Sequence, residues 1–276
     1  WQLIKSQLSI NIRVSKNVMK KSMILNYQIH LNEAATGKTP LVFIHGLFGS
    51  LSNLGMLARA YYESHSVIQI DVRNHGHSAH SPEMNYPVMA ADILETLDAL
   101  NIQKFSVIGH SMGGKIAMQL ASSAGERLEQ LVVLDMTPFA YKESHHDQIF
   151  KALFAVQNAQ IESRQQAMQI MREYLHEEMV IQFLMKSFNK GQWLFNVEAL
   201  FNHYPDIINW DVIQPWQKEA LFIRGGKSAY ISKDEHFAAI QQQFPHAKIA
   251  VLEEAGHWLH AEKTQQVLDE MNKYLN

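Results

Sequence analysis

Short apolar runs alternate with longer amphipathic stretches along most of the chain. Seven runs have the length and composition of strands, at residues 24–31, 41–45, 66–71, 105–110, 131–135, 220–225 and 248–253. Several are apolar almost throughout, as expected of parallel strands that are covered on both faces. The stretches 87–100, 112–124 and 262–275 repeat apolar residues at helical spacing. This alternation predicts an α/β fold with a mostly parallel central sheet flanked by helices.

One long segment interrupts the alternation. Between Pro138 and Pro215 no strand is predicted, and Gln, Met, Phe and Trp recur at helical spacing. We expect three or four helices, inserted between two strands of the sheet. An excursion of this length in a compact domain is typical of a lid or a binding element. The predicted organisation is a core formed by residues 23–137 and 217–276, with a helical cap at 138–216.

The first 22 residues differ from the rest. They contain five Lys or Arg residues and no acidic residue, and their apolar positions are too interrupted for a secretory signal. We expect residues 1–22 to be an N-terminal extension, either a leader or an added segment, that is not part of the native domain.

Composition narrows the function classes. The chain has 276 residues, of which 47% are hydrophobic and 18% charged, with a net charge of −3. This balance is typical of a globular protein and argues against nucleic-acid binding, which usually needs a basic surface. No stretch approaches the roughly 18 consecutive apolar residues of a membrane span. The absence of cysteine excludes disulfides and thiolate chemistry. A cytoplasmic location is expected, and the oligomeric state is left open.

Ser111 is the candidate nucleophile. It lies between Gly109 and Gly113 in GHSMGG, after the predicted strand 105–110 and before the predicted helix 112–124. A strand–turn–helix setting of this kind presents a nucleophilic serine, and its glycines make room for the sharp turn. The alternative is an ordinary serine in a βα loop. Because a lone hydroxyl is a weak nucleophile, a base and an orienting acid are required.

Among 15 histidines, His257 is the candidate base. It lies in EEAGHWLH, after the last predicted strand, so it is expected at the same carboxyl edge of the sheet as Ser111. His260 is expected at the start of the final helix with a structural role or an exposed side chain. The side chain of His110 is expected to point away from Ser111.

The segment FIHGLFGS at 43–50 supplies candidate oxyanion donors. Gly46 lets the backbone turn after a strand, so the amide of Leu47 can face a bound oxyanion together with the amide of Met112. A plain glycine-containing turn is the alternative. Gly46 and the neighbouring Phe48 are also the predicted substrate-binding residues.

Five segments together resemble the α/β-hydrolase superfamily: HGLFGS, DVRNHGHS, GHSMGGKIAM, LVVLDMTP and EEAGHWLHAEK. More narrowly, they resemble the YbfF-type bacterial esterases and their mitochondrial relatives. The resemblance covers nearly the whole chain from Met23 and places 138–215 where that family carries its helical cap. It implies hydrolysis of esters or thioesters by a serine, a histidine and an acid, with no metal and no organic cofactor.

The acid has more than one candidate. Many α/β-hydrolases carry it in the loop after the strand that follows the cap, but that loop here reads RGGKSAYISKDE and has no carboxylate at the usual position. Asp234 lies later in this loop and is expected to begin a helix, and Glu198 lies in the cap. Asp135 ends LVVLD, on a strand expected beside that of Ser111. The resemblance favours Asp135, although it could instead anchor the following turn.

The predicted function is that of a serine carboxylesterase for short-to-medium acyl esters or thioesters. Aromatic and methionine side chains in the predicted cap suit a pocket for an acyl chain, although most of them are expected to pack the cap itself. The alternatives are a C–C hydrolase or a cofactor-free haloperoxidase of the same fold, or a non-catalytic ligand-binding member.

Overall fold

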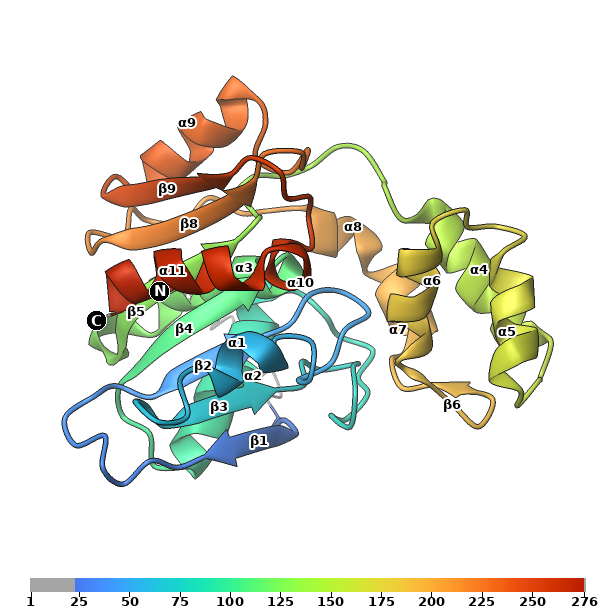
Figure 1. The fold of residues 1–276 in the computed structure, drawn as a ribbon, viewed down its shortest axis with the longest axis horizontal. Helices are drawn as coiled ribbons and strands as arrows, with labels where there is room; N and C mark the ends of the chain where they lie inside the picture. The colour runs from blue at the N-terminus through green and yellow to red at the C-terminus, as the bar shows by residue number, and fades with distance from the viewer. Residues whose placement is uncertain (1–22, 276) are drawn as a thin grey trace, which may run out of the picture.

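A seven-stranded sheet runs through the centre of the computed structural model, which describes residues 23–275 (Figure 1). Its spatial order is β1-β3-β2-β4-β5-β8-β9, with β1 antiparallel to β3 and all other neighbours parallel. The strands are β1 (Tyr27–His30), β2 (Leu41–Ile44), β3 (Val67–Ile70), β4 (Phe105–His110), β5 (Leu128–Leu134), β8 (Ala220–Gly225) and β9 (Ala247–Leu252). The predicted fold class and all seven predicted strands are therefore confirmed, with ends that differ by up to three residues.

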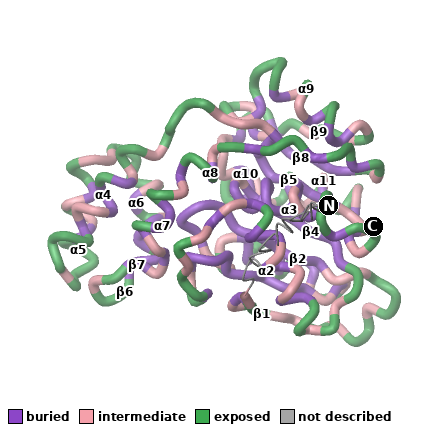
Figure 2. Tube along the Cα trace, turned by 180° about the vertical axis from the view of Figure 1, so that it is seen from behind, coloured by how far each residue is buried: buried purple, intermediate pink, exposed green. Residues whose placement is uncertain are grey.

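Helices cover both faces of the sheet. Those of the core are α1 (Gly55–Arg59), α2 (Tyr86–Ala99), α3 (Met112–Ser123), α9 (Asp234–Gln243), α10 (Leu259–Glu262) and α11 (Thr264–Leu275), with a 3-10 turn at Gly125–Arg127. Side chains alternate along each strand. On β2, Val42 and Ile44 belong to the core that includes α2 and α3, whereas Leu41 and Phe43 belong to the core with α1 and α11. The central strands are therefore buried on both sides (Figure 2).

The cap is inserted between β5 and β8. It contains α4 (Asp147–Asn158), α5 (Arg164–Met171), α6 (Glu178–Met185), α7 (Val197–Asn202) and α8 (Tyr204–Ile208). The cap lies beyond the carboxyl ends of the strands, on the right in Figure 1. Five helices replace the three or four expected, because the last stretch of cap divides into two short helices, with Pro205 in the first turn of α8.

The prediction that the cap contains no strand is wrong. A small antiparallel hairpin pairs β6 (Phe188–Asn189) with β7 (Gln192–Trp193). Its two-residue turn consists of Lys190 (φ +46°) and Gly191 (φ +80°). Tight hairpins are commonly joined by two residues that both have a positive φ. Strands of two residues are too short to give an alternating pattern, so only the glycine marks them in the sequence.

The predicted extension at residues 1–22 lies outside the described part of the chain. Between Met23 and Leu275, none of the helices combines the length and the apolar character needed to cross a membrane.

Candidate active site

Ser111 lies on a strained turn between β4 and α3. Its φ of +56° and ψ of −122° are unfavourable for a residue with a side chain. The flanking glycines allow this turn by close approach of backbone atoms. A Cβ on Gly109 would lie 2.1 Å from the carbonyl oxygen of Gly113, and a Cβ on Gly113 would lie 2.2 Å from that of Ile44. The turn thus presents the serine hydroxyl at the carboxyl end of the sheet.

The structure brings Ser111, His257 and Asp135 together from three separate loops. Nε2 of His257 lies 2.9 Å from Oγ of Ser111, and Nδ1 lies 2.6 Å from Oδ2 of Asp135. An ionised carboxylate can only accept hydrogen bonds, so Nδ1 carries a proton and donates a hydrogen bond to Asp135. Nε2 is then free to accept a proton from the serine hydroxyl. Such an arrangement can raise the nucleophilicity of a serine.

Asp135 is fully buried and follows β5 with a φ of +50°. The amide of Gly225 donates to its Oδ1 at 2.9 Å, and the hydroxyl of Ser228 donates to its Oδ2. The carboxylate is therefore held by three donors, counting His257. Sequence reasoning missed Ser228. The only signal was a small hydroxyl residue at the position where many relatives have a carboxylate.

The two rival carboxylates lie elsewhere. Asp234 is the first residue of α9, as expected, and Glu198 lies in the first turn of α7 in the cap. Both are exposed to solvent. Of the three candidates, the carboxylate that contacts His257 is that of Asp135.

The loop after β2 runs directly beside the serine. A Cβ on Gly46 would lie 3.1 Å from Cβ of Ser111. Within residues 23–275, no acceptor pairs with the backbone amides of Leu47 and Met112. Met112 begins α3, where the first amides of a helix lack partners and the helix dipole favours negative charge. Both predicted donors thus have a free N–H group near Ser111.

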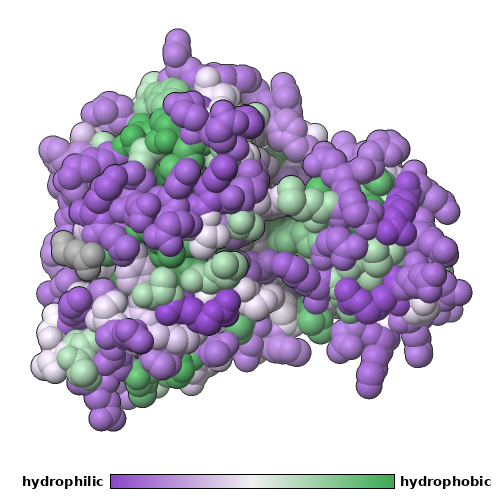
Figure 3. All heavy atoms as spheres, viewed as in Figure 1, coloured by the Kyte–Doolittle hydropathy of each residue, from purple (hydrophilic) through white to green (hydrophobic). Residues whose placement is uncertain are grey.

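Two clefts meet at Ser111. The tyrosine cleft is lined by residues that include Tyr86, Tyr141, Tyr204 and Tyr230, together with Leu47, Ser111, Met112, Lys115, Met136, Ile207 and Ile208. The histidine cleft is lined by residues that include His110, His146, His257 and His260, together with Gly46, Leu47, Phe48, Ser111, Ile149, Val180, Phe183 and Trp258. Both include cap residues, and a recess between core and cap is visible in Figure 3.

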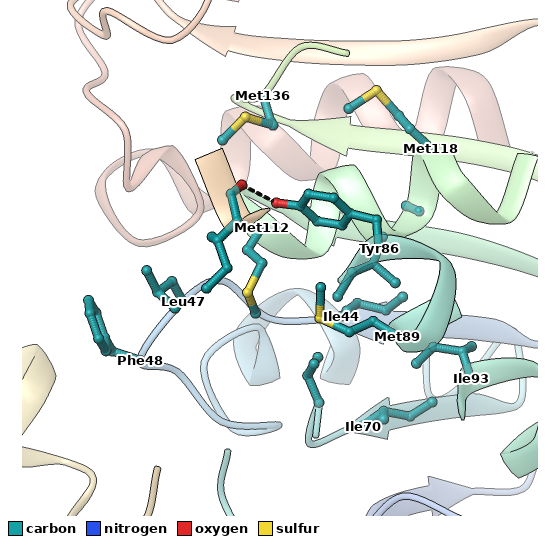
Figure 4. Packing of buried hydrophobic residues seen from close by; sticks show 14 of the residues in the cluster. Ile44, Leu47, Phe48, Ile70, Tyr86, Met89, Ile93, Met112, Met118 and Met136 are labelled. Atoms are coloured by element: carbon teal, nitrogen blue, oxygen red, sulfur yellow. Dashed lines mark hydrogen bonds between the residues drawn. The ribbon is translucent and has the colours of Figure 1, made fainter. Parts of the chain in front are cut away.

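The predicted substrate-binding residues Gly46 and Phe48 both line the histidine cleft. Phe48 is only 2% exposed because its ring also packs against Phe150 and Phe195 of the cap. Leu47 and Met112 lie near Tyr86, whose hydroxyl donates to the carbonyl oxygen of Ile207 (Figure 4). The loop after β2 and the cap are therefore in contact beside Ser111.

Several residues at the site were not anticipated. The ring of Tyr230 stacks on His257 with centroids 4.1 Å apart. Nε2 of His110 donates to the carbonyl oxygen of His257 at 2.8 Å, so His110 lies against the base instead of pointing away from the site. His260 lies in the short helix α10, just before the final helix where it was expected, and is buried against His110. Burial lowers the pKa of the Lys115 amine, in the tyrosine cleft, to about 7.

Within residues 23–275, no three side chains of His, Asp or Glu form a group that could hold a metal ion. The chemistry that the site offers is that of a hydroxyl, an imidazole, a carboxylate and two backbone amides.

Comparison with known proteins agrees with this chemistry. Residues 39–264 match the profile of the family described as alpha/beta hydrolase fold. Esterase YbfF of Escherichia coli (strain K12) is 48% identical, over 92% of this chain and 100% of that protein. The sn-1-specific diacylglycerol lipase ABHD11 of Danio rerio is 35% identical, over 95% of this chain and 86% of that protein. A solved structure titled "Marine microorganism esterase" superposes with a TM-score of 0.86 at 29% identity, over 92% of this chain and 100% of that chain.

Proposed function

The chain belongs to the α/β-hydrolase family and is a hydrolase of the esterase type, and on that premise we propose that it is a serine carboxylesterase acting on short-to-medium acyl esters, thioesters included. The observation that carries the proposal is the continuous chain of hydrogen bonds from Ser111 through His257 to Asp135, beside two unpaired amides.

The proposed mechanism is acyl transfer. His257 takes the proton of the Ser111 hydroxyl while Oγ forms a bond to the carbonyl carbon of the substrate. Asp135 keeps the imidazole in the tautomer that accepts at Nε2 and stabilises the imidazolium. The amides of Leu47 and Met112 bind the oxyanion of the tetrahedral intermediate. His257 then protonates the leaving alcohol or thiol, and a water molecule activated by the same imidazole hydrolyses the acyl-enzyme.

The two clefts divide the substrate between them. The leaving group must lie within reach of the imidazole that protonates it, and His257 lines the histidine cleft. The alcohol or thiol therefore occupies the histidine cleft. The acyl chain occupies the tyrosine cleft, on the side of Met112 and Met136.

Replacement of the nucleophile tests the proposal. Ser111→Ala removes the atom that bonds to the acyl group, so turnover of nitrophenyl esters should be lost. The circular dichroism spectrum and the midpoint of thermal unfolding should stay close to those of the wild type. A fluorophosphonate should label the wild-type protein on Ser111 and leave Ser111→Ala unlabelled. Full activity of the variant would exclude Ser111 as the nucleophile.

A substrate panel distinguishes the alternatives. Nitrophenyl esters and acyl-CoA thioesters of increasing chain length should be hydrolysed. Diketones, and halide with peroxide, should not react. Turnover confined to diketones would favour a C–C hydrolase, and turnover confined to halide and peroxide a haloperoxidase. A protein that turns over nothing and resists the fluorophosphonate would be a ligand-binding member. The cytoplasmic location and the boundaries of the cap stay predictions.

A further inference from the structure

Two buried histidines contact the backbone on either side of the Leu47 amide. His45 directly follows β2, and its Nδ1 lies 2.7 Å from the carbonyl oxygen of Gly46. His75 lies in the loop after β3, and its Nε2 accepts from the amide of Phe48 at 3.1 Å. The rings are 1% and 0% exposed and meet edge to face, with centroids 5.1 Å apart. No step of the proposed mechanism uses either ring.

Backbone amides fix which nitrogen of each ring carries the proton. The amide of Val72 donates to Nε2 of His45 at 3.0 Å, so Nδ1 of that ring is the donor to Gly46. Nε2 of His75 accepts from Phe48, so its Nδ1 donates to the carbonyl oxygen of Arg73 at 2.9 Å. Both rings are therefore neutral. Burial lowers the pKa of His45 and lowers that of His75 to about 3, which is consistent with this state.

The carbonyl oxygen of Gly46 accepts from Nδ1 of His45 and also from the amide of Gly49 at 3.1 Å, and its direction determines where the Leu47 amide points. The carbonyl of Gly46 and the N–H of Leu47 belong to one planar trans peptide, so they point in opposite directions. Because His45 is the side chain that helps to fix this carbonyl, it also helps to fix the N–H on the opposite side of the peptide, in a residue that lines both clefts together with Ser111. The next peptide is held as well, because Phe48 has a φ of +63°, which a residue with a side chain disfavours. The bond from its amide to His75 stabilises that conformation.

We propose that His45 and His75 are positioning residues that together aim the Leu47 amide at the oxyanion. The inference rests on the proposed function and deepens it, since it names what holds one of the two donors in place. If the two histidines served stability alone, any substitution of them that leaves the protein folded would leave kcat unchanged.

Matched amide substitutions separate the two hydrogen bonds of each ring. An Asn side chain can place its NH₂ group near the position of Nδ1, and a Gln side chain can place its carbonyl oxygen near Nε2. At position 45, Asn keeps the donor to Gly46 and Gln keeps the acceptor for Val72. At position 75, Gln keeps the acceptor for Phe48 and Asn keeps the donor to Arg73. The bonds that matter for Leu47 are thus kept by His45→Asn and His75→Gln.

The expected result is a crossed pattern. His45→Gln and His75→Asn should lower kcat by about tenfold to a hundredfold, less than the loss of a whole oxyanion donor, with KM within about twofold. Their affinity for an alkyl boronic acid, which forms a tetrahedral adduct with the serine, should fall by a similar factor. His45→Asn and His75→Gln should keep most of kcat. If one variant does not fold, the pair at the other position still gives the comparison.

His65 offers a matched control. It is 4% exposed, its Nδ1 pairs with the hydroxyl of Ser64, and it lines neither cleft. His65→Gln and His65→Asn should lower the midpoint of thermal unfolding without changing kcat. Losses of kcat that follow unfolding midpoints across all six variants, or equal kcat in all of them, would overturn the inference. If wild-type protein is inert to ester and fluorophosphonate, the proposed function fails instead.

Discussion

At the scale of single residues, the orientation of His257 depends on the carboxylate of Asp135. Asp135→Asn should lower kcat about ten-thousandfold, because an amide at this position favours the wrong imidazole tautomer. Asp234→Asn and Glu198→Gln are the matched controls, and both should keep near-normal kcat because these side chains are exposed and the carboxylate bonded to His257 is that of Asp135. The measurement is kcat for nitrophenyl acetate in the wild type and the three variants. Near-normal turnover in Asp135→Asn, with collapse in either control, would reassign the acid.

Motifs with a steric or chemical requirement are the residues that sequence reasoning finds. Gly109 and Gly113 are required because a Cβ at either position would lie 2.1 or 2.2 Å from a backbone oxygen, so the turn around Ser111 leaves a recognisable signature. Ser228 leaves only its place in the loop where many relatives have a carboxylate, because a serine in a loop has many ordinary uses and its contact with Asp135 joins residues 93 positions apart. Tyr230 leaves no signature, because its contact with His257 depends on how two loops pack.

At the scale of secondary structure, the sequence predicts the buried strands but not the short helices and strands of the cap. Strands such as β4 are apolar on both faces, which gives an uninterrupted run. The two-residue strands β6 and β7 and the five-residue helix α8 are too short for a pattern of apolar residues to repeat along them. Their positions are set by packing within the cap, not by local periodicity.

One contact between elements carries a pH dependence. Lys115 of α3 donates to the carbonyl oxygens of Ile208 and Asn209, at the end of α8, at 2.9 Å each. Burial lowers the pKa of Lys115 to about 7 in the folded protein, whereas the pKa of a lysine in the unfolded chain is about 10.4. Between these values the unfolded chain binds the extra proton. The free energy of unfolding should therefore increase as the pH rises from about 7 toward 10.

Lys115→Met tests this dependence. The variant leaves the carbonyl oxygen of Asn209 without a donor and that of Ile208 with the Tyr141 amide alone, which should lower the free energy of unfolding by about 1–3 kcal/mol at pH 9. The deficit should be smaller at pH 7, because the wild type there has lost part of its own stability. Urea unfolding at both pH values measures it, with the exposed Lys151→Met as control. A deficit that shrinks from pH 7 to pH 9 would contradict the lowered pKa.

At the scale of the whole molecule, the position of the cap was the least predictable feature. The sequence indicates an insertion between two strands, and the chain enters it from the carboxyl end of β5, at the edge of the sheet that also carries Ser111. The shape of the two clefts follows from the packing of cap residues such as Val180 and Ile208 over Ser111, which no pattern along the chain specifies.

The division of the substrate between the clefts can be tested by filling each one separately. Ile208 lines the tyrosine cleft and Val180 the histidine cleft, and both are half-buried aliphatic residues. Ile208→Trp should lower kcat/KM increasingly as the acyl chain of a nitrophenyl ester lengthens, because the added ring occupies acyl space. Val180→Trp should do so as the alcohol of an acetate ester lengthens. If each variant responds to the other series, the assignment of acyl and alcohol sides must be exchanged. If both respond equally to both series, the clefts act as one chamber.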